Sequence, residues 1–466
     1  MKYCLQVGLA VLAAGTLDVR AAEPTASARP NVVVILVDDF GYECVGANGG
    51  TSYRTPVMDK LAATGVRFDS CYAQAVCTPT RVQLMTGLYN VRNYTDFGSM
   101  DPRSVTFANL LQRDGYATCI AGKWQLGVDP DLPRKFGFDE SCLWQHTRAE
   151  KQAPGRYMNP GLEINGVARN WQNKEYGPDI VSDYALDFIQ RKKDRPFLLY
   201  YTMMLTHSPY DATPDSADYG EKQLGARAGI AKVRSDGINQ HFSDMTAYAD
   251  KLVGKLLARL DELHLRDNTL VILLGDNGTQ RGVLSMMGER RVIGGKGLPT
   301  DAGMHVPLIV NWPGHAAAGQ VCRDLIDTTD FLPTIMEAVG RPVPAELPFD
   351  RHSFLPQVKG QKGRPREWYY CWYAPTDAII AEFAATHDFK LSRTGDFYDL
   401  RTDLEEKQPL TVASLKGETA AAAKLLQGAL DRYREARPAG MAKPWSGPKT
   451  RGGRGIDRIN RTDETN

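Results

Sequence analysis

Residues 31–39 of the chain read Asn-Val-Val-Val-Ile-Leu-Val-Asp-Asp. An unbroken apolar run between Pro30 and two aspartates is typical of a strand that is buried on both faces of a parallel sheet. Asp38 and Asp39 then stand at the carboxyl end of this strand, where open α/β sheets place their ligands. The stretch therefore predicts both the class of the fold and the location of a functional site.

Strand and helix patterns alternate after this stretch. Further buried strands are predicted at residues 117–121, 196–202, 269–274 and 306–311. Helices are predicted at residues 55–65, 106–114, 179–192, 243–265 and 329–339. This alternation predicts a three-layer α/β sandwich, in which a large, mostly parallel sheet lies between two layers of helices.

Three regions interrupt the alternation. Residues 129–177 are rich in Gly, Pro, Asn and aromatic residues, and we expect long loops there with a small hairpin around 162–167. Residues 342–365 are rich in proline and are predicted to be a connection. The tail, residues 438–466, has charge, glycine and proline without an apolar period, so it is predicted to be disordered.

Short strand candidates follow the proline-rich connection, within residues 368–400, and a terminal helix is predicted at 417–437. These elements predict a small antiparallel subdomain that packs on the large domain. The expected organisation is a large N-terminal α/β domain over 22–341 and a C-terminal subdomain over 342–437.

The first residues resemble an export signal. Residues 1–21 combine Lys2, an apolar segment from Tyr3 to Leu17 and small residues up to Ala21, which is the pattern of a cleaved signal peptide. The apolar segment is too short to span a bilayer. We therefore expect a periplasmic or secreted protein without stable membrane insertion, and the formal net charge of +1 gives no indication of a nucleic-acid partner.

The chain has eight cysteines. Cys4 belongs to the predicted signal peptide, and six remain when Cys77 is set aside. An even number in an exported protein permits disulfides, but the spacing fixes no connectivity. No CxxC pair is present, so a zinc or redox cluster is not predicted.

A second informative stretch spans residues 77–87, Cys-Thr-Pro-Thr-Arg-Val-Gln-Leu-Met-Thr-Gly. Thr78 can cap a helix that begins at Pro79, which places Cys77 just outside a helix N-terminus. Arg81 is four residues further along and therefore on the same face. A thiol, a guanidinium and a helix dipole then converge on one anionic group, although a cysteine in this position is also compatible with packing or a disulfide.

Oxygen-bearing residues stand at the ends of two predicted strands. Asp38 and Asp39 follow the first strand, and Asp276 and Asn277 follow the strand at 269–274. Carboxylates and amides are ligands for hard cations such as Ca²⁺ or Mg²⁺. Either pair taken alone could simply form a turn.

The pattern Cys77-x-Pro79-x-Arg81 followed by Thr86-Gly87 resembles the signature of type I sulfatases, in the alkaline phosphatase superfamily, whose cysteine is converted to formylglycine. Other segments, between about residues 30 and 435, match the family in the same order. They are Asn31–Asp39 with Gly41, Thr55-Pro56, Gly122-Lys123-Trp124, His207-x-Pro209, Gly275–Gly278, Gly295-Lys296-Gly297, Val306–Val310, Phe389-Lys390-Leu391 and Phe397–Leu400.

The resemblance implies a role for each matching residue. Asp38, Asp39, Asp276 and Asn277 are expected to bind a calcium ion, and formylglycine from Cys77 is expected to attack the sulfur. Of the remaining residues, those expected to bind the sulfate or to supply the proton for the leaving oxygen are Arg81, Lys123, His207 and Lys296. The implied protein is an exported sulfatase for a sulfated carbohydrate or another sulfate ester, and it requires a formylglycine-generating maturation enzyme.

Two positions depart from the family. Gln125 replaces a histidine that many sulfatases use as a base, and glutamine cannot take up a proton in that way. Another group, such as His146, could do so, or Gln125 could alter the contacts with the substrate. His305 replaces a common arginine, and we expect a structural effect. The loop residues proposed for contact with the substrate are Gln125, His146, Arg148, Arg92 and Asn93.

Two other functions remain open from the sequence. A phosphonate or phosphodiester hydrolase of the same superfamily can use the same modified cysteine. A carbohydrate-binding protein on this scaffold would tolerate Gln125 and an unmodified Cys77, although the otherwise complete set of site residues argues against that alternative.

Overall fold

A computed structural model describes residues 29–144, 146–147, 155–221, 239–347, 350, 352–374, 380–439 and 441. The predicted signal peptide and nearly all of the predicted tail lie outside these residues. Within the described part of the chain, no helix is both long and apolar enough to cross a membrane.

The central sheet has eleven strands and is parallel in its middle. In spatial order the strands of its main path are β12 (Gln320–Cys322), β2 (Val66–Tyr72), β11 (His305–Asn311), β8 (Thr269–Gly275), β1 (Asn31–Val37), β7 (Phe197–Thr202), β3 (Ala117–Lys123), β4 (Glu140–Trp144), β5 (Gly161–Ile164) and β6 (Val167–Asn170), and β13 (Ile326–Asp327) pairs with β2. Strands β8, β1, β7, β3 and β4 run parallel, and β11 runs antiparallel to β8. The predicted buried strand is thus the centre of the sheet.

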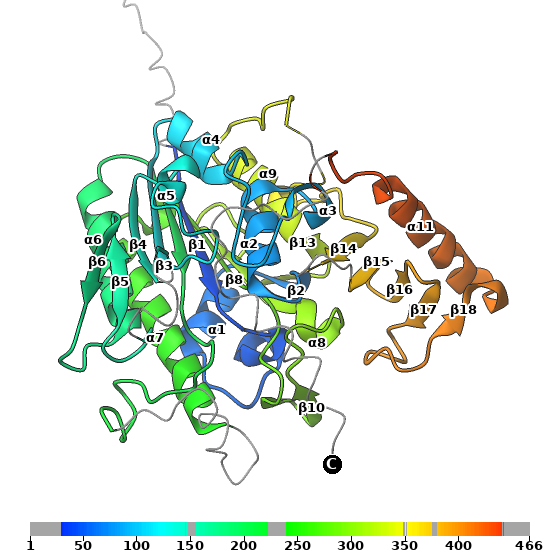
Figure 1. The fold of residues 1–466 in the computed structure, drawn as a ribbon, viewed down its shortest axis with the longest axis horizontal. Helices are drawn as coiled ribbons and strands as arrows, with labels where there is room; N and C mark the ends of the chain where they lie inside the picture. The colour runs from blue at the N-terminus through cyan, green and yellow to red at the C-terminus, as the bar shows by residue number, and fades with distance from the viewer. Residues whose placement is uncertain are drawn as a thin grey trace, which may run out of the picture.

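Alternate residues of β1 point into two separate cores, which explains its continuous apolar sequence. Val33, Ile35 and Val37 belong to one core, with α1 (Pro56–Ala63), α6 (Gly177–Lys192) and α7 (Gln240–Glu262). Val32, Val34 and Leu36 belong to the other core, whose helices are α2 (Cys77–Thr86), α4 (Phe107–Arg113), α5 (Leu132–Lys135), α9 (Phe331–Ala338) and α10 (Leu355–Val358). Figure 1 shows the two helical layers on either side of the sheet. The three-layer prediction is confirmed.

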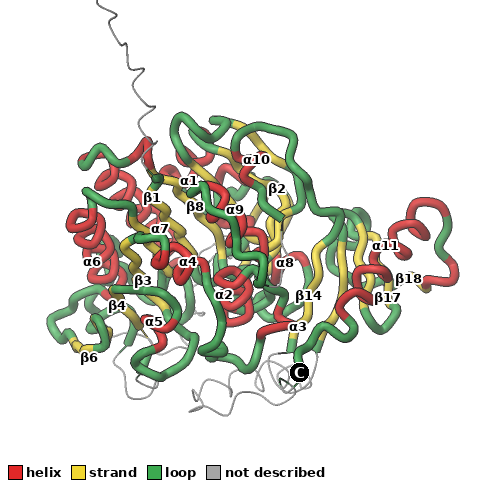
Figure 2. The backbone as a smooth tube through the Cα atoms, turned by 90° about the horizontal axis from the view of Figure 1, so that it is seen from above, coloured by secondary structure: helices red, strands yellow, loops and turns green. Residues whose placement is uncertain are grey.

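The smaller sheet is antiparallel, as predicted. Its strands are β14 (Tyr369–Tyr373), β15 (Ala381–Ala385), β16 (Phe389–Ser392), β17 (Asp396–Asp399) and β18 (Leu410–Thr411), and α11 (Gly417–Tyr433) packs on one face with α3 (Asn90–Asn93). Its other face contacts Ala75 and Val76, which precede α2, and Met304 of α8 (Asp301–Met304). In Figure 2 this sheet and α11 lie at the opposite end of the molecule from α6. The small sheet therefore supports the start of α2.

Some elements were not predicted. Strand β4 lies within the region predicted as loops, and it joins the sheet by pairing with β3, while β5 and β6 form the expected hairpin. A second hairpin, β9 (Leu284–Met287) and β10 (Arg290–Ile293), and strand β2 were also missed. Short 3₁₀ turns occur at Tyr42–Cys44, Gly46–Asn48, Arg266–Asn268, Thr328–Asp330 and Val412–Ser414. The missed strands are short or mixed in polarity. Strands β2 and β4 are defined by pairing with strands distant in sequence, whereas β9 and β10 pair with each other across a two-residue turn.

Two other predictions concern the connection and the cysteines. Within 342–365, Phe354, Leu355 and Val358 pack into a core of the large sheet, so part of the connection belongs structurally to the large domain. The domain boundary itself stays a prediction. All seven described cysteines are free thiols, so no disulfide joins them.

Candidate active site

The predicted site residues meet at the carboxyl ends of the central strands. Asp38 and Asp39 directly follow β1, Lys123 is the last residue of β3, and Asp276 and Asn277 directly follow β8. Strands β1 and β8 are in register up to the pair of Val37 and Gly275, so their polar ends lie side by side. The Asp39 N–H donates a hydrogen bond of 3.0 Å to Asp276 Oδ1, which connects the ends of the two strands.

The position of Lys123 requires glycine before it. Gly122 has a φ of +123°, and a Cβ atom there would lie 1.7 Å from the carbonyl oxygen of Thr202. A side chain at this position would push β3 away from β7. The close approach of these strands therefore fixes the place from which Lys123 enters the site.

Helix α2 begins at Cys77 itself, with Val76 in the capping position, so the prediction that Thr78 caps a helix starting at Pro79 is wrong. The Thr78 hydroxyl instead accepts a hydrogen bond from the Gly98 N–H at 3.0 Å. The thiol therefore sits on the first residue of the helix, next to its unpaired N–H groups.

The thiol of Cys77 is enclosed by charged groups. Its Sγ lies 3.1 Å from Lys123 Nζ, 3.4 Å from Asp38 Oδ1 and 3.8 Å from Asp39 Oδ1. The residue is 1% exposed. Burial and the charge of Asp276 raise the pKa of the Cys77 thiol, so the cysteine is a neutral thiol at neutral pH and not an activated thiolate.

Each buried carboxylate has a cation beside it. Lys123 Nζ is 2.8 Å from both oxygens of Asp38, and Arg81 Nη2 is 3.0 Å from Asp276 Oδ2. Lys296 Nζ is 2.7 Å from Asp39. The site thus contains three acids and three permanent cations within the protein interior.

The pKa values of the three acids diverge. Burial alone would raise the pKa of Asp38, but Lys123 and the other cations outweigh it and hold the value well below the usual range. Burial and the nearby charge of Asp38 raise the pKa of Asp276 to about 7. Without a bound metal ion, Asp276 is therefore the acid that most readily keeps a proton.

The oxygen donors fit a hard cation. One ligand atom from each of Asp38, Asp39, Asp276 and Cys77 can be chosen so that all lie within 4.8 Å of one another. Asn277 Oδ1 is buried without a hydrogen-bond partner, while its Nδ2 donates to Asp39 Oδ1 and to the Gly278 carbonyl. A buried, unpartnered amide oxygen among carboxylates is the donor set that calcium prefers.

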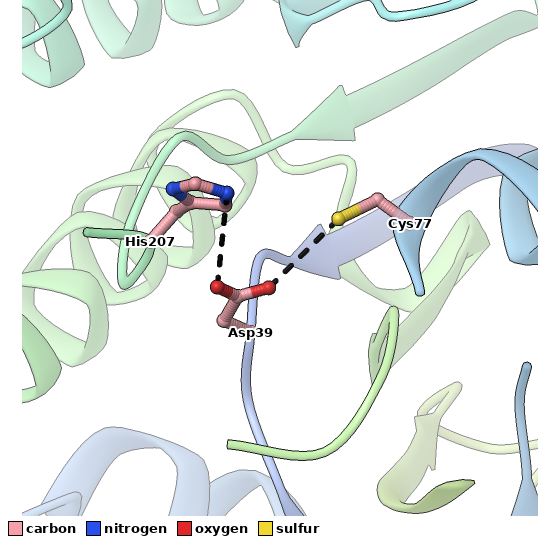
Figure 3. A group of neighbouring side chains, drawn as sticks. All are labelled: Asp39, Cys77 and His207. Carbon is pink, nitrogen blue, oxygen red and sulfur yellow. Dashed lines mark hydrogen bonds and ion pairs between the residues drawn. The ribbon is translucent and has the colours of Figure 1, made fainter. Parts of the chain in front are cut away.

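His207 lies in the loop after β7 and joins the cluster that contains Asp39 and Cys77. Its Nε2 is 3.8 Å from Asp39 Oδ2, and Nδ1 lies 2.6 Å from the Ser208 carbonyl. Burial lowers the pKa of His207 to about 3, so the ring is neutral. Because the Ser208 carbonyl can only accept, Nδ1–H donates to it, and Nε2 faces the site as an acceptor. Figure 3 shows Asp39 between His207 and Cys77.

The five residues predicted to contact substrate are placed differently. Gln125 adopts a φ of +56°, close to Lys123, and its side-chain oxygen is buried without a partner. His146 Nε2 lies 3.0 Å from the Asp129 carbonyl, and the ring packs edge-on against Trp124. Arg148 lies outside the described residues.

Arg92 and Asn93 have structural partners. Arg92 Nε donates to Asp350 Oδ2 at 2.7 Å and lies over the ring of Tyr433, and Asn93 Nδ2 donates to Thr86 Oγ1 at 2.8 Å. Among the described contacts, none joins these two side chains or His146 to Cys77. The described contacts therefore favour packing roles for Arg92 and Asn93.

Sequence reasoning missed two arginines near the site. Arg156 is stacked over the Trp144 ring at 3.9 Å, and its charge acts on His207. Arg281 donates from Nε to the Lys296 carbonyl at 3.0 Å. Their basic character was visible in the sequence, but neither lies in a strand-end motif.

His305 has the structural role that we expected. Its ring stacks on Tyr42 and Tyr72, with centroid distances of 4.1 and 5.1 Å. Nε2 lies 2.9 Å from the Asp69 carbonyl, and Nδ1 lies 3.3 Å from Asp301. Burial lowers the pKa of His305, but Asp301 outweighs this effect and raises the value above 6.5.

We expect His305→Phe, which keeps the ring stacking, to lower the free energy of unfolding by about 1–2 kcal/mol because Asp301 and the Asp69 carbonyl lose a charged donor. Since the folded pKa is raised, this stabilisation is fully present below about pH 6.5 and is lost as the pH rises through the folded pKa. Urea unfolding of both proteins between pH 5.5 and 8.5 measures the difference. A constant difference across this range would contradict the charged interaction.

Comparisons with known proteins agree with the fold. The sulfatase family model matches residues 30–341, and the model for the C-terminal part of N-sulphoglucosamine sulphohydrolase matches residues 294–434. N-acetylgalactosamine-6-sulfatase of Mus musculus is 32% identical over 410 residues, which are 78% of this chain and 72% of that protein. Arylsulfatase A of Homo sapiens is 30% identical over 403 residues, covering 76% and 73%.

Among solved structures, BT4656 in complex with its substrate D-glucosamine-2-N,6-O-disulfate is similar, with a TM-score of 0.69 and 22% identity. The match covers 87% of this chain and 98% of that one. At this identity the likeness concerns the fold.

Proposed function

This chain belongs to the sulfatase family of sulfuric ester hydrolases, and on that basis we propose that it is an exported, calcium-dependent enzyme that hydrolyses a sulfate monoester of a carbohydrate through formylglycine formed from Cys77. The observation that carries the proposal is the position of Cys77. Its side chain lies at the first residue of α2, in contact with Lys123 and the carboxylates at the end of β1.

The state of the thiol argues against direct attack by the unmodified cysteine. Burial keeps Cys77 protonated, so the unmodified residue is poorly suited to attack. Its Sγ stands in for an oxygen of the hydrated aldehyde, which would supply the nucleophile after conversion. The predicted maturation enzyme is the required partner for this step.

Calcium would be held by Asp38, Asp39, Asp276 and Asn277, and when bound it would supply positive charge to the sulfate oxygens. Support comes from the unpartnered Asn277 Oδ1 and from the three clustered acids. Asp276 is our candidate for accepting a proton from the nucleophile, because one of its carboxylate oxygens lies within 4.8 Å of Cys77 Sγ.

The permanent cations are suited to binding the sulfate. Lys123 and Lys296 each approach the site from a different strand or loop, and Arg81 presents a guanidinium from α2. Two opposite charges 4 Å apart attract by about 4 kcal/mol at an effective dielectric constant near 20. Several such contacts stabilise the charge that is shared over the sulfuryl oxygens.

His207 and Lys296 are our candidates for protonating the leaving oxygen. The bond between Nδ1 and Ser208 fixes the ring and leaves Nε2 directed toward Asp39. His207 would need to gain a proton as an anionic substrate enters, since an approaching negative charge raises its pKa. Gln125 cannot act as a base, and the described partners of His146 give no support to His146 as its replacement.

The substrate class is proposed from the relatives. Their names include an N-acetylgalactosamine-6-sulfatase, and the similar structure BT4656 binds a disulfated glucosamine. Both names refer to sulfated sugars, which supports a sulfated carbohydrate as the substrate of this chain. Export rests on the sequence pattern of residues 1–21.

The test is release of the anion. Protein co-produced with a formylglycine-generating enzyme should release sulfate from a pool of sulfated glycans and no phosphate from phosphate or phosphonate esters. Ion chromatography measures both anions in the same sample. Phosphate alone would favour the phosphoesterase alternative, and binding of glycans without either anion would favour the carbohydrate-binding alternative.

A further inference from the structure

The segment between the predicted metal ligands and Lys296 is basic. Residues 278–295 contain Arg281, Arg290 and Arg291 and a single acid, Glu289, although the whole chain has a net charge of only +1. This segment forms the β9–β10 hairpin, and Figure 1 shows β10 at the lower edge of the molecule, below α8. Of these three arginines, Arg281 is the one with a described contact to the loop of Lys296.

Arg281 is anchored to the loop that carries Lys296. Its Nε donates to the Lys296 carbonyl at 3.0 Å, and its Nη2 lies 3.6 Å from the position that a Cβ of Gly297 would occupy. The loop itself is fixed, because the Lys296 N–H donates to the Thr279 carbonyl and the Gly297 N–H to the Ala75 carbonyl. The guanidinium is therefore held at a defined distance from the catalytic candidate Lys296.

The outer nitrogens of this guanidinium have no acidic partner. Within the described part of the chain, no carboxylate lies within 4.0 Å of Arg281. By contrast, Arg401 pairs with Asp399 and Glu418, and Arg393 pairs with Glu382. A guanidinium that is partly buried, fixed through Nε and unpaired at its two Nη groups can accept an anionic group in a bidentate manner.

Lys296 links Arg281 with the centre of the site. Its carbonyl accepts the hydrogen bond from Arg281 Nε, and its Nζ lies 2.7 Å from Asp39. Asp39 Oδ1 in turn lies 3.8 Å from Cys77 Sγ. A substrate group bound at Arg281 would thus remain close to the scissile sulfate.

We propose that Arg281 forms a second anion site, beside the site for the scissile sulfate, that takes another sulfate or a carboxylate of the same substrate molecule. This inference rests on the proposed sulfatase function and narrows the substrate class to carbohydrates with at least two anionic groups. The binding contribution of Arg281 is made outside the reacting centre, so it affects affinity more than the chemical step.

The test compares inhibitors of the matured enzyme with para-nitrophenyl sulfate as the substrate. Bis-sulfates of linear diols, from ethanediol to hexanediol, span a range of distances, and the monosulfates of the same diols lack the second group. Sulfate esters of the corresponding hydroxy acids distinguish a carboxylate from a sulfate. We expect at least one two-anion compound to bind roughly tenfold or more tightly than its monosulfate.

Arg281→Gln should remove this preference, and it should leave the inhibition by monosulfates within about twofold. Arg291→Gln is the matched control, because it removes the same charge from the nearby strand β10, at an exposed position without a described contact to Lys296. The control should keep the preference.

The two proposals fail in different ways. If the wild type hydrolyses sulfate esters but Arg281→Gln retains the preference, the second anion site is wrong and the sulfatase function stands. If no sulfate ester is hydrolysed, the proposed function is wrong, and calorimetric titration with the same compounds still measures the preference. Equal losses in Arg281→Gln and Arg291→Gln would indicate a diffuse charge effect and would overturn the specific site.

Discussion

Cys77→Ala should abolish sulfate release, with a loss in kcat of at least about a thousandfold, because removal of a nucleophile leaves only binding and electrostatic contributions. Alanine also removes the atom that contacts Lys123 and Asp38. Single-turnover assays with excess enzyme measure the loss. The tryptic peptide that contains residue 77, analysed by mass spectrometry, shows whether the wild-type cysteine has been converted.

Cys322→Ala is the matched control, since this free cysteine lies in β12, at the edge of the sheet. It should retain normal turnover. Cys77→Ser tests the modification separately, because serine supplies an oxygen without becoming an aldehyde under a maturation enzyme that accepts only cysteine. Activity of Cys77→Ala near that of the wild type would refute the assignment of the nucleophile.

Removal of calcium should have the second largest effect. Without calcium, Asp38, Asp39 and Asp276 keep their lysine and arginine partners, whereas the Asn277 oxygen has no partner. We expect chelation with EGTA to lower kcat by about a hundredfold or more, and added Ca²⁺ to restore it. Mg²⁺ should restore less, because it requires a smaller, octahedral set of ligands.

The same ion should stabilise the fold. A ligand that binds only the native state contributes about 2.7 kcal/mol when its concentration is one hundred times its Kd. Differential scanning calorimetry with and without Ca²⁺ measures this shift, and Asp39→Asn should remove most of it. Asp129→Asn, a substitution at a partly exposed acid that pairs with Lys135, should leave it unchanged. An unchanged Tm in saturating Ca²⁺ would contradict the metal site.

Calcium affinity should depend on pH in a defined direction. The pKa of Asp276 is raised to about 7, so this acid is protonated below that pH in the metal-free protein, and the proton competes with the ion. Apparent affinity should therefore rise with pH up to about 7 and level off above it. Calorimetric titrations between pH 5.5 and 8 measure this dependence.

Local sequence patterns were sufficient for the core of the fold. The apolar run of β1 indicated burial on both faces, because each side chain of a strand between two helical layers packs into one of the two cores. Polar residues at the ends of predicted strands indicated the site, because parallel strands bring their carboxyl ends to one edge of the sheet. These residues are Asp38, Asp39, Lys123 and Asp276. The family resemblance ordered these residues into a site, and the structure brings them into contact.

The tertiary structure decided what depends on partners distant in sequence. Strand β4 pairs with β3 and strand β2 pairs with β11, and their own short sequences do not specify these partners. The partners of Arg92 and Asn93, which were predicted to contact substrate, are set by packing around α3 and α11. Sequence gives the residue types, but it does not state which groups lie within hydrogen-bonding distance.

The charges of the site also show the difference between what the sequence indicates and what the tertiary structure decides. From sequence, Asp38, Asp39 and Asp276 are three equivalent acids with ordinary pKa values. In the folded protein, Lys123 lowers the pKa of Asp38, whereas burial and the charge of Asp38 raise that of Asp276. The sequence by itself indicated the polar residues at the strand ends and the sheet edge on which they stand. Only the tertiary structure decided their separate chemical roles and the position of Arg281, because electrostatic energies depend on distance and burial, which folding alone establishes.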